Sequence, residues 1–169
     1  MKKAIIVGAS SGIGLEVARC LVADGWAVGL MARRTSLLEA VRSEHPSAVW
    51  VQSCDVCSPT AVQALEQLAD SMGGVDLYFH AAGIGRQNMA LDATTELSTL
   101  DTNVMGFSRM VGAAFRYMAA HGGGHIAVIS SIAGVKGLGP APSYSASKAF
   151  QNVYIQALEQ LAHTRALPI

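Results

Sequence analysis

Short apolar runs alternate with longer segments of helical period along this chain. The runs have the length of buried strands and lie at Ala4–Val7, Ala27–Ala32, Ala48–Ser53, Leu77–Ala81 and His125–Ser130. Helices are predicted between them at Ile13–Ala23, Ser36–Glu44, Pro59–Ser71, in two pieces across Ala93–Ala120, and at Tyr144–His163. Strict alternation of strand and helix predicts an α/β domain, with a doubly wound parallel sheet covered by helices on both faces.

Signals at the element boundaries agree with this order. Gly25 follows the first helix as a stop, Ser58-Pro59 supplies an N-cap and a first helical residue, and Gly73-Gly74 ends the third helix. The glycine-rich stretches 122–124 and 136–140 are predicted to be loops within the pattern, so no linker divides the chain. Residues 1–169 are therefore expected to form one domain.

Composition and charge exclude several classes of protein. The chain carries 12 Lys and Arg against 12 Asp and Glu, and the absence of a basic stretch argues against nucleic-acid and membrane-surface binding. No apolar run approaches about 18 residues, so no membrane span is predicted, and the apolar N-terminus is predicted to be a strand rather than a signal peptide. Three cysteines, an odd number, indicate a reducing cytoplasm rather than a disulfide framework.

A glycine-rich turn links the first strand to the first helix. In Gly8–Gly14 small residues allow a phosphate group to approach backbone N–H groups at a helix N-terminus. The expected contacts to a dinucleotide are Gly8, Ser10, Ser11, Gly12, Ile13 and Gly14. The spacing Gly-x-x-x-Gly-x-Gly differs from Gly-x-Gly-x-x-Gly, and the alternative is a glycine-rich turn that binds nothing. No Gly-Lys-Ser/Thr follows, which argues against a nucleoside triphosphatase loop.

Arg33 and Arg34 follow the second strand, where an acidic residue would bind the 2′-hydroxyl of a NAD ribose. Arginine binds phosphate through two parallel hydrogen bonds, which suits a 2′-phosphate. The alternative is a solvated pair at a helix start, although cations there oppose the helix dipole. The pair predicts NADP rather than NAD as the cofactor.

The next two strand ends carry cysteine and small residues. In Cys54–Cys57 the Cys-x-x-Cys spacing can indicate a redox pair or half of a metal site. No second pair of ligands accompanies it, so we expect two small buried thiols and no metal, with Asp55 facing an adenine ring. His80 is expected to be a packed strand residue rather than a ligand, and the small residues that follow it allow the backbone to pass beneath a bound cofactor.

Three polar residues are predicted to converge after the fifth strand. Tyr144 and Lys148 share one face at the start of a helix, and Ser131 ends the preceding strand. Parallel strands end at the ligand crevice of such a sheet. A phenol ordinarily titrates near pH 10 and needs about 4 kcal/mol to become a proton donor near neutrality, and an ammonium about 5 Å away supplies roughly 3 kcal/mol. Each residue alone has an ordinary explanation as a helix start, a solvated cation or a cap.

These residues resemble those of the short-chain dehydrogenase/reductase family along the whole chain. The matching positions are Gly8-x-x-x-Gly12-x-Gly14, Asp55-Val56, Ala81-Ala82-Gly83, Asn103, Ser131 and Tyr144-Ser-Ala-Ser-Lys148. The resemblance implies a three-layer Rossmann fold with strand order 3-2-1-4-5. His80-Ala81 departs from the family's Asn-Asn pair, which puts side-chain support for the fourth strand in doubt.

The resemblance also implies an activity, namely hydride transfer between NADP(H) and a small carbonyl compound or secondary alcohol. Tyr144 would exchange a proton with the substrate oxygen, Ser131 would hydrogen-bond that oxygen, and Asn103 would anchor a water in the proton relay. Lys148 would make the phenol more acidic and hold the nicotinamide ribose. Cofactor contacts are also implied for Arg33, Arg34, Asp55, Val56, Ala82, Gly83, Tyr144 and Lys148.

Two other functions remain open, a non-catalytic NADP-binding sensor or scaffold and an S-adenosylmethionine methyltransferase on a similar fold. The methyltransferase leaves Tyr144 and Lys148 unexplained. By resemblance we expect the sixth and seventh strands and a substrate lid to be missing from this chain, which leaves an apolar edge at the fifth strand. We also expect a cytoplasmic location, and a homodimer or homotetramer that packs through Asn103–Ala120 and Tyr144–His163.

Overall fold

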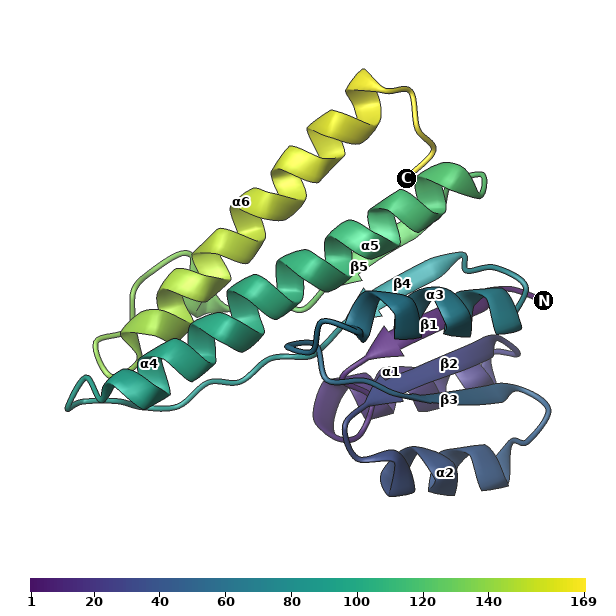
Figure 1. The fold of residues 1–169 in the computed structure, drawn as a ribbon, viewed down its shortest axis with the longest axis horizontal. Helices are drawn as coiled ribbons and strands as arrows, with labels where there is room; N and C mark the ends of the chain where they lie inside the picture. Colours follow the sequence, from purple (N-terminus) through teal and green to yellow (C-terminus); the bar gives the residue numbers. More distant parts are fainter.

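The computed structural model describes residues 1–169, in which strands and helices alternate (Figure 1). The strands are β1 (Lys3–Val7), β2 (Ala27–Ala32), β3 (Val49–Ser53), β4 (Leu77–His80) and β5 (His125–Val128). The helices are α1 (Gly12–Ala23), α2 (Thr35–Glu44), α3 (Ala61–Ser71), α4 (Ala93–Leu100), α5 (Phe107–Ala120) and α6 (Pro142–Thr164). A π-helical turn, η1 (Asp101–Gly106), joins α4 to α5, and a 3-10 turn, η2 (Ile132–Gly134), precedes α6.

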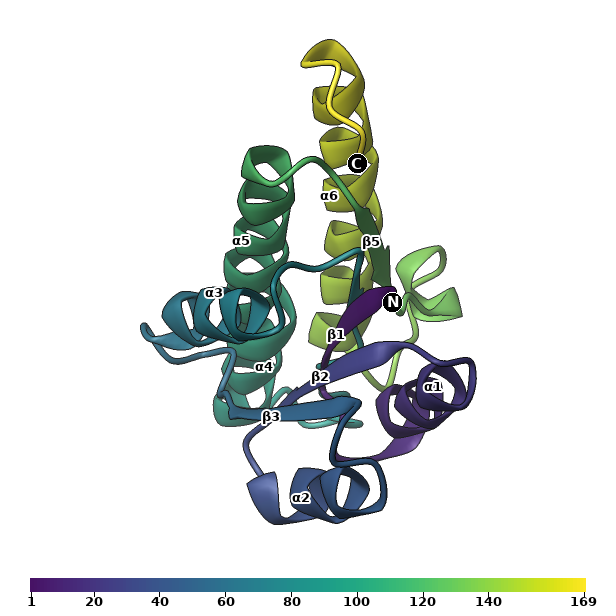
Figure 2. The same ribbon diagram turned by 90° about the vertical axis from the view of Figure 1, so that its right-hand side faces the viewer.

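All five strands are parallel and lie in the order β3-β2-β1-β4-β5, which confirms the predicted fold class and strand order. Helices α1 and α2 cover one face of the sheet, and α3, α5 and α6 lie toward the other (Figure 2). Every residue of β2 is buried, because this strand has a neighbour on each side and helices on both faces.

Successive residues of β1 point into two separate parts of the core. Ile5 and Val7 belong to a cluster of 19 buried residues on the side of α3 and α5. Ile6 belongs to a cluster of 9 buried residues on the side of α1 and α2. This alternation is the two-residue period of a strand, and it explains why apolar runs rather than alternating patterns mark the strands of this sequence.

Some element boundaries differ from the predicted ones. Helix α3 begins at Ala61 rather than Pro59, because Ser58 Oγ accepts a hydrogen bond from the Thr60 N–H (3.2 Å) in a turn before the helix. The two predicted pieces across 93–120 form one continuous rod, in which α4 passes through η1 into α5. Helix α6 begins at Pro142 rather than Tyr144, since proline has no N–H to leave unpaired in a first turn.

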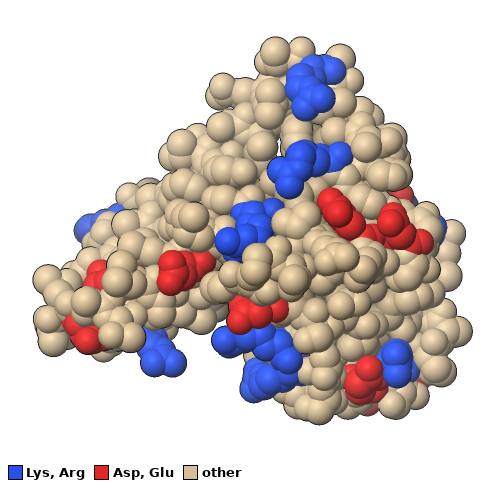
Figure 3. All heavy atoms as spheres, viewed as in Figure 1, with Lys and Arg blue, Asp and Glu red and all other residues tan.

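Strand β5 lies at one edge of the sheet, as predicted, and pairs with β4 alone. Its residues Ile126–Val128 are half-buried. The C-terminal residues lie beside the beginning of this strand, where the Gly124 N–H donates to the Pro168 carbonyl (2.9 Å). Charged side chains form small groups rather than a field of one sign on the face shown in Figure 3. None of the helices is both long enough and apolar enough to cross a lipid bilayer.

His80 ends β4 inside the core and is a packed strand residue, as expected. Its side chain is 3% exposed, its ring meets Phe107 edge to face, and its Nδ1 lies 2.8 Å from the Tyr78 hydroxyl. These contacts give β4 the side-chain support that the missing Asn-Asn pair put in doubt. Burial, and after it the positive charge of Lys148, lower the pKa of His80 to about 3, although a contact with the Ala82 backbone raises it slightly.

This buried imidazole predicts a loss of stability in mild acid. The folded protein keeps His80 neutral, whereas the unfolded chain protonates it near pH 6.5, so stability is lost as the pH falls from about 6.5 toward 3. At pH 5 the free energy of unfolding should be lower by about 2 kcal/mol on this account. The change in the urea midpoint between pH 7 and pH 5 should therefore be smaller in His80→Asn than in the wild type.

The matched control is His45→Asn, because His45 is exposed. This variant should keep the pH dependence of the wild type. Equal pH dependence in wild type and His80→Asn would show that the His80 ring does not carry the effect.

Candidate active site

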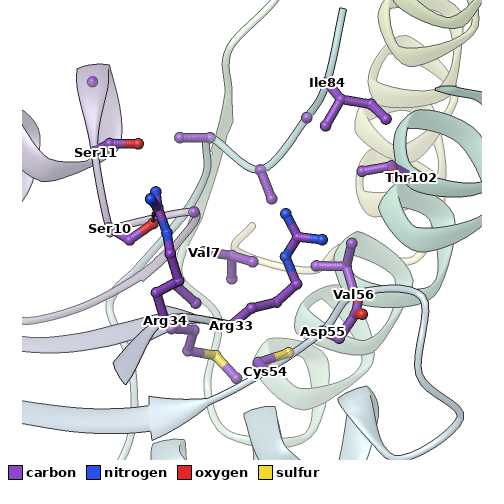
Figure 4. Close-up of a pocket in the computed structure, with 18 of the residues that line it drawn as sticks. Val7, Ser10, Ser11, Arg33, Arg34, Cys54, Asp55, Val56, Ile84 and Thr102 are labelled. Atoms are coloured by element: carbon purple, nitrogen blue, oxygen red, sulfur yellow. Dashed lines mark hydrogen bonds between the residues drawn. The ribbon is translucent and has the colours of Figure 1, made fainter. Parts of the chain in front are cut away.

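A cavity of about 590 Å³ opens at the carboxyl ends of the strands, bounded by the turns that follow β1, β2, β3 and β4 (Figure 4). The cofactor contacts predicted on these four turns all line it. They are Gly8, Ser10, Ser11, Gly12, Ile13, Gly14, Arg33, Arg34, Asp55, Val56, Ala82 and Gly83. We call this space the glycine-turn cavity.

The three glycines of the turn differ in what surrounds them. A Cβ on Gly8 would lie 2.5 Å from the Ala82 backbone nitrogen, so this position lets the turns after β1 and β4 touch. A Cβ on Gly14 would collide with the Gly8 carbonyl, so this position lets α1 pack on the turn. Gly12 has φ +57° and open space where a Cβ would be. The helix N-terminus is therefore open toward the cavity at Gly12, as close approach of a phosphate requires.

The first turn of α1 has no anionic or side-chain cap. Its N-cap residue, Ser11, makes no capping hydrogen bond with its side chain, and no acidic residue lies in the first turn. Backbone N–H groups at a helix N-terminus favour an anion. These groups and the open space at Gly12 fit the phosphates of a dinucleotide.

The two arginines after β2 are exposed and reach different parts of this cavity. Arg34 Nη2 donates to Ser10 Oγ (3.2 Å), which places this guanidinium beside the glycine turn. Figure 4 shows Arg33 extending into the same cavity on the side of Val56. Neither arginine forms an ion pair with a carboxylate of the protein. Both cations are thus available to an anionic group in the cavity.

The segment after β3 corrects one expectation. Cys54 is buried as predicted, and burial, followed by the charge of Asp55, raises its pKa to about 11. Cys57, however, is exposed and lines the cavity. The carboxylate of Asp55 accepts a hydrogen bond from the Cys57 N–H (3.0 Å), and this tight turn directs the second thiol away from the core. Asp55 itself lines the cavity, where an adenine was expected.

A second cavity of about 410 Å³ contains Tyr144 and Lys148, and we call it the tyrosine cavity. It adjoins the first, and the two share their lining residues Ala81, Gly83, Ile84, Arg86 and Ile129. Lys148 is 6% exposed, and its Nζ lies 5.9 Å from the centre of the Tyr144 ring. Burial lowers the pKa of Lys148. The predicted convergence of Tyr144 and Lys148 at the strand ends is therefore present, whereas Ser131, the third residue of that prediction, is not among the residues that line this cavity.

The lysine amine is held on the core side of its helix. Its Nζ donates to the Ile129 carbonyl (2.7 Å), at the end of β5, and to Gln151 Oε1 (3.0 Å). Gln151 in turn donates from Nε2 to the Asn103 carbonyl (2.8 Å). Gln151 was not predicted as a site residue, although its position three residues after Lys148 places it on the same helix face.

Asn103 lies fully buried in η1 and fixes the segment after β4. Its Oδ1 accepts the Ile84 N–H (2.9 Å), and its Nδ2 donates to the Ile84 carbonyl (2.7 Å) and to Ser147 Oγ (3.0 Å). Asn103, which was expected to anchor a water, instead bonds to protein groups here and acts as a structural clamp. Its long-range partners could not be read from the sequence around position 103.

The two serines after β5 have different surroundings. Ser131 begins η2, and its Oγ accepts the Ala133 N–H (3.2 Å). Ser130 lines the tyrosine cavity, and its hydroxyl donates to Asn152 Oδ1. Sequence reasoning placed only Ser131 at the site. It also passed over Arg86, a cation on the wall of both cavities, and Thr102, which lines the glycine-turn cavity.

Comparisons with known proteins agree with this geometry. Residues 2–167 match the family described as short chain dehydrogenase. The chain is 34% identical over 163 aligned residues to an uncharacterized oxidoreductase of Myxococcus xanthus, covering 93% of this chain and 64% of that protein. It is 33% identical over 150 residues to a 3-oxoacyl-[acyl-carrier-protein] reductase of Bos taurus, covering 87% and 63% of the two chains.

Among solved structures, an actinorhodin polyketide ketoreductase with NADPH superposes with a TM-score of 0.85 at 30% identity, covering 93% of this chain and 63% of that one. The chain thus spans 63% to 64% of the length of these three proteins. The family match covers nearly the whole chain, and the parallel sheet with the order β3-β2-β1-β4-β5 agrees with the likeness to this solved structure. The chain belongs to the short-chain dehydrogenase family.

Proposed function

We propose that this protein is an NADP(H)-dependent oxidoreductase that interconverts a carbonyl group and a secondary alcohol. The observation that carries the proposal is the buried Lys148 amine beside the Tyr144 ring, in a cavity that adjoins the glycine-turn cavity. A nicotinamide supplies or accepts the hydride when it is bound, and the protein supplies the proton and the orientation.

Tyr144 is the proposed general acid and base. A positive charge close to a phenolate favours the ionised form. The amine of Lys148 lies 5.9 Å from the centre of the Tyr144 ring, and no carboxylate lines the tyrosine cavity to neutralise it. In carbonyl reduction the phenol gives its proton to the oxygen as the hydride reaches the carbon, and solvent restores the proton to the phenolate.

Ser131 is the proposed hydrogen-bond donor to the substrate oxygen. Because its Oγ accepts the Ala133 N–H, its own hydroxyl hydrogen remains free to donate. The hydroxyl of Ser130, in contrast, already donates to Asn152. Asn103 is proposed to keep the loop after β4 in place through Ile84, which both cavities share.

The test of the activity is Tyr144→Phe in the purified chain, assayed with NADPH and a panel of ketones. Removal of the phenol hydroxyl should lower turnover by about 100-fold or more, the range of general acid catalysis. NADPH binding, measured by fluorescence, should persist because the glycine turn and the arginines are unchanged. Tyr154→Phe on the same helix is the matched control, since Tyr154 packs on Phe107 instead of lining either cavity.

Unchanged turnover in Tyr144→Phe would refute the proposed role of the phenol. NADPH binding by the wild type without turnover of any compound in a wide carbonyl panel would instead support the non-catalytic NADP-binding protein.

Cofactor preference can be tested at the two arginines that follow β2. We propose that Arg33 and Arg34 bind the 2′-phosphate of NADP, because both line the cavity without a carboxylate partner. Replacing either by alanine should weaken NADPH binding by about tenfold while leaving NADH binding nearly unchanged, as expected for loss of one charge-assisted hydrogen bond. Arg42→Ala is the control, since Arg42 pairs with Glu39 on α2 away from this cavity. Equal losses for NADH and NADPH would contradict the assignment.

A further inference from the structure

A fully buried amide connects the lysine of the site to the π turn. Gln151 is 1% exposed, although glutamine side chains are mostly exposed in folded proteins. Both ends of its amide are used, with Oε1 accepting from Lys148 Nζ (3.0 Å) and Nε2 donating to the Asn103 carbonyl (2.8 Å). Burying an amide is unfavourable unless it is hydrogen-bonded, so this arrangement fixes the side chain in one orientation.

The chemistry of the partners determines which way the amide faces. The Asn103 carbonyl can only accept, so the NH₂ group of Gln151 must face it, and the oxygen is left for Lys148. The reversed amide would put N–H donors against an ammonium and an oxygen against a carbonyl. The lysine therefore always finds an acceptor at this position.

A lysine ammonium has three N–H donors. The Ile129 carbonyl and Gln151 Oε1 take two of them on the core side. The third donor is left for the tyrosine cavity, where Tyr144 lies. The Lys148 side chain carries its ammonium on a flexible four-carbon stem, so the two fixed acceptors determine the position of the positive charge.

We propose that Gln151 is a positioning residue for the reaction, which holds the Lys148 ammonium beside Tyr144 without cancelling its charge. This inference rests on the proposed function. A glutamate here would also accept from Lys148, but its negative charge would neutralise the ammonium and its second oxygen would face the Asn103 carbonyl. An apolar side chain of the same shape would leave the ammonium with the Ile129 carbonyl alone.

Other charged groups near Lys148 do not replace this role. His80 is close enough for its pKa to respond to the lysine, and its pKa of about 3 keeps it neutral above pH 5. Glu96 on α4 accepts a hydrogen bond from Asn88 Nδ2 (2.8 Å). Other charged groups on the segments packed against this part of α6 include Arg86, Asp92, Asp101 and Lys136, which are exposed.

The experiment compares Gln151→Met and Gln151→Glu with the wild type. Methionine keeps the unbranched shape without the hydrogen bonds, and glutamate keeps the acceptor but adds a charge. The measurement is the ultraviolet titration of the Tyr144 phenol, taken as the difference between each protein and its Tyr144→Phe counterpart. In both variants the midpoint should move to higher pH by about one unit, a tenfold weaker acid.

The pH profile of alcohol oxidation should move in the same direction, with kcat lowered about tenfold near neutrality and the KM for NADP nearly unchanged. Gln160→Leu, at an exposed position of the same helix, should leave both the titration and the pH profile unchanged. If Gln151→Met does not fold, Gln151→Leu takes its place, because leucine also occupies the position without a hydrogen-bond acceptor and without adding a charge.

Lower thermal stability with an unmoved phenol titration would show that Gln151 only ties α6 to η1, and would overturn the proposal. The titration does not depend on turnover. A shifted midpoint in a protein that reduces no carbonyl compound would therefore support the positioning role while refuting the proposed activity.

Discussion

Because β1 pairs in parallel with both β2 and β4, these strands end on the same side of the sheet, and the chain returns each time through a helix. The glycine turn, the arginine pair, the turn at Asp55 and the small residues after β4 therefore all lie at the carboxyl ends of the strands. Backbone donors and cations thus come to face one cavity through the connectivity of the sheet. No single motif would produce that cavity without the pairing.

Features with a local cause could be predicted from the sequence. Strand positions follow from apolar runs, and the role of Gly8 follows from its place between a strand and a helix. Cys57 was wrongly predicted to be buried; it is exposed, in a turn where its N–H donates to the Asp55 carboxylate. The use of Gln151 depends on Asn103, 48 residues earlier in the chain, and no local pattern reports that distance. The residues of the candidate site were therefore easier to predict from the sequence than the long-range contacts between them.

Buried polar groups in this charge-poor protein gather in one region. Asn103, Ser147, Lys148 and Gln151 are buried around η1 and the first turns of α6, and all four have hydrogen-bond partners. The Nε2 atom of His80, at the adjoining end of β4, is the one buried side-chain nitrogen or oxygen without a partner. The unfavourable desolvation of polar groups is thus concentrated beside Tyr144, the proposed general acid and base.

The unequal division of the core has a dynamic consequence. The side that carries α1 and α2 contains 9 clustered buried residues, against 19 on the side of α3 and α5. Local opening requires less free energy where less apolar surface is buried, so backbone amides of α2 should exchange with solvent sooner than those of α5. The glycine turn and the arginine pair flank this thinner half. A nucleotide bound at the glycine turn would raise the free energy of local opening on the side of α1 and α2, so that binding would stabilise the part of the fold with the smaller buried core.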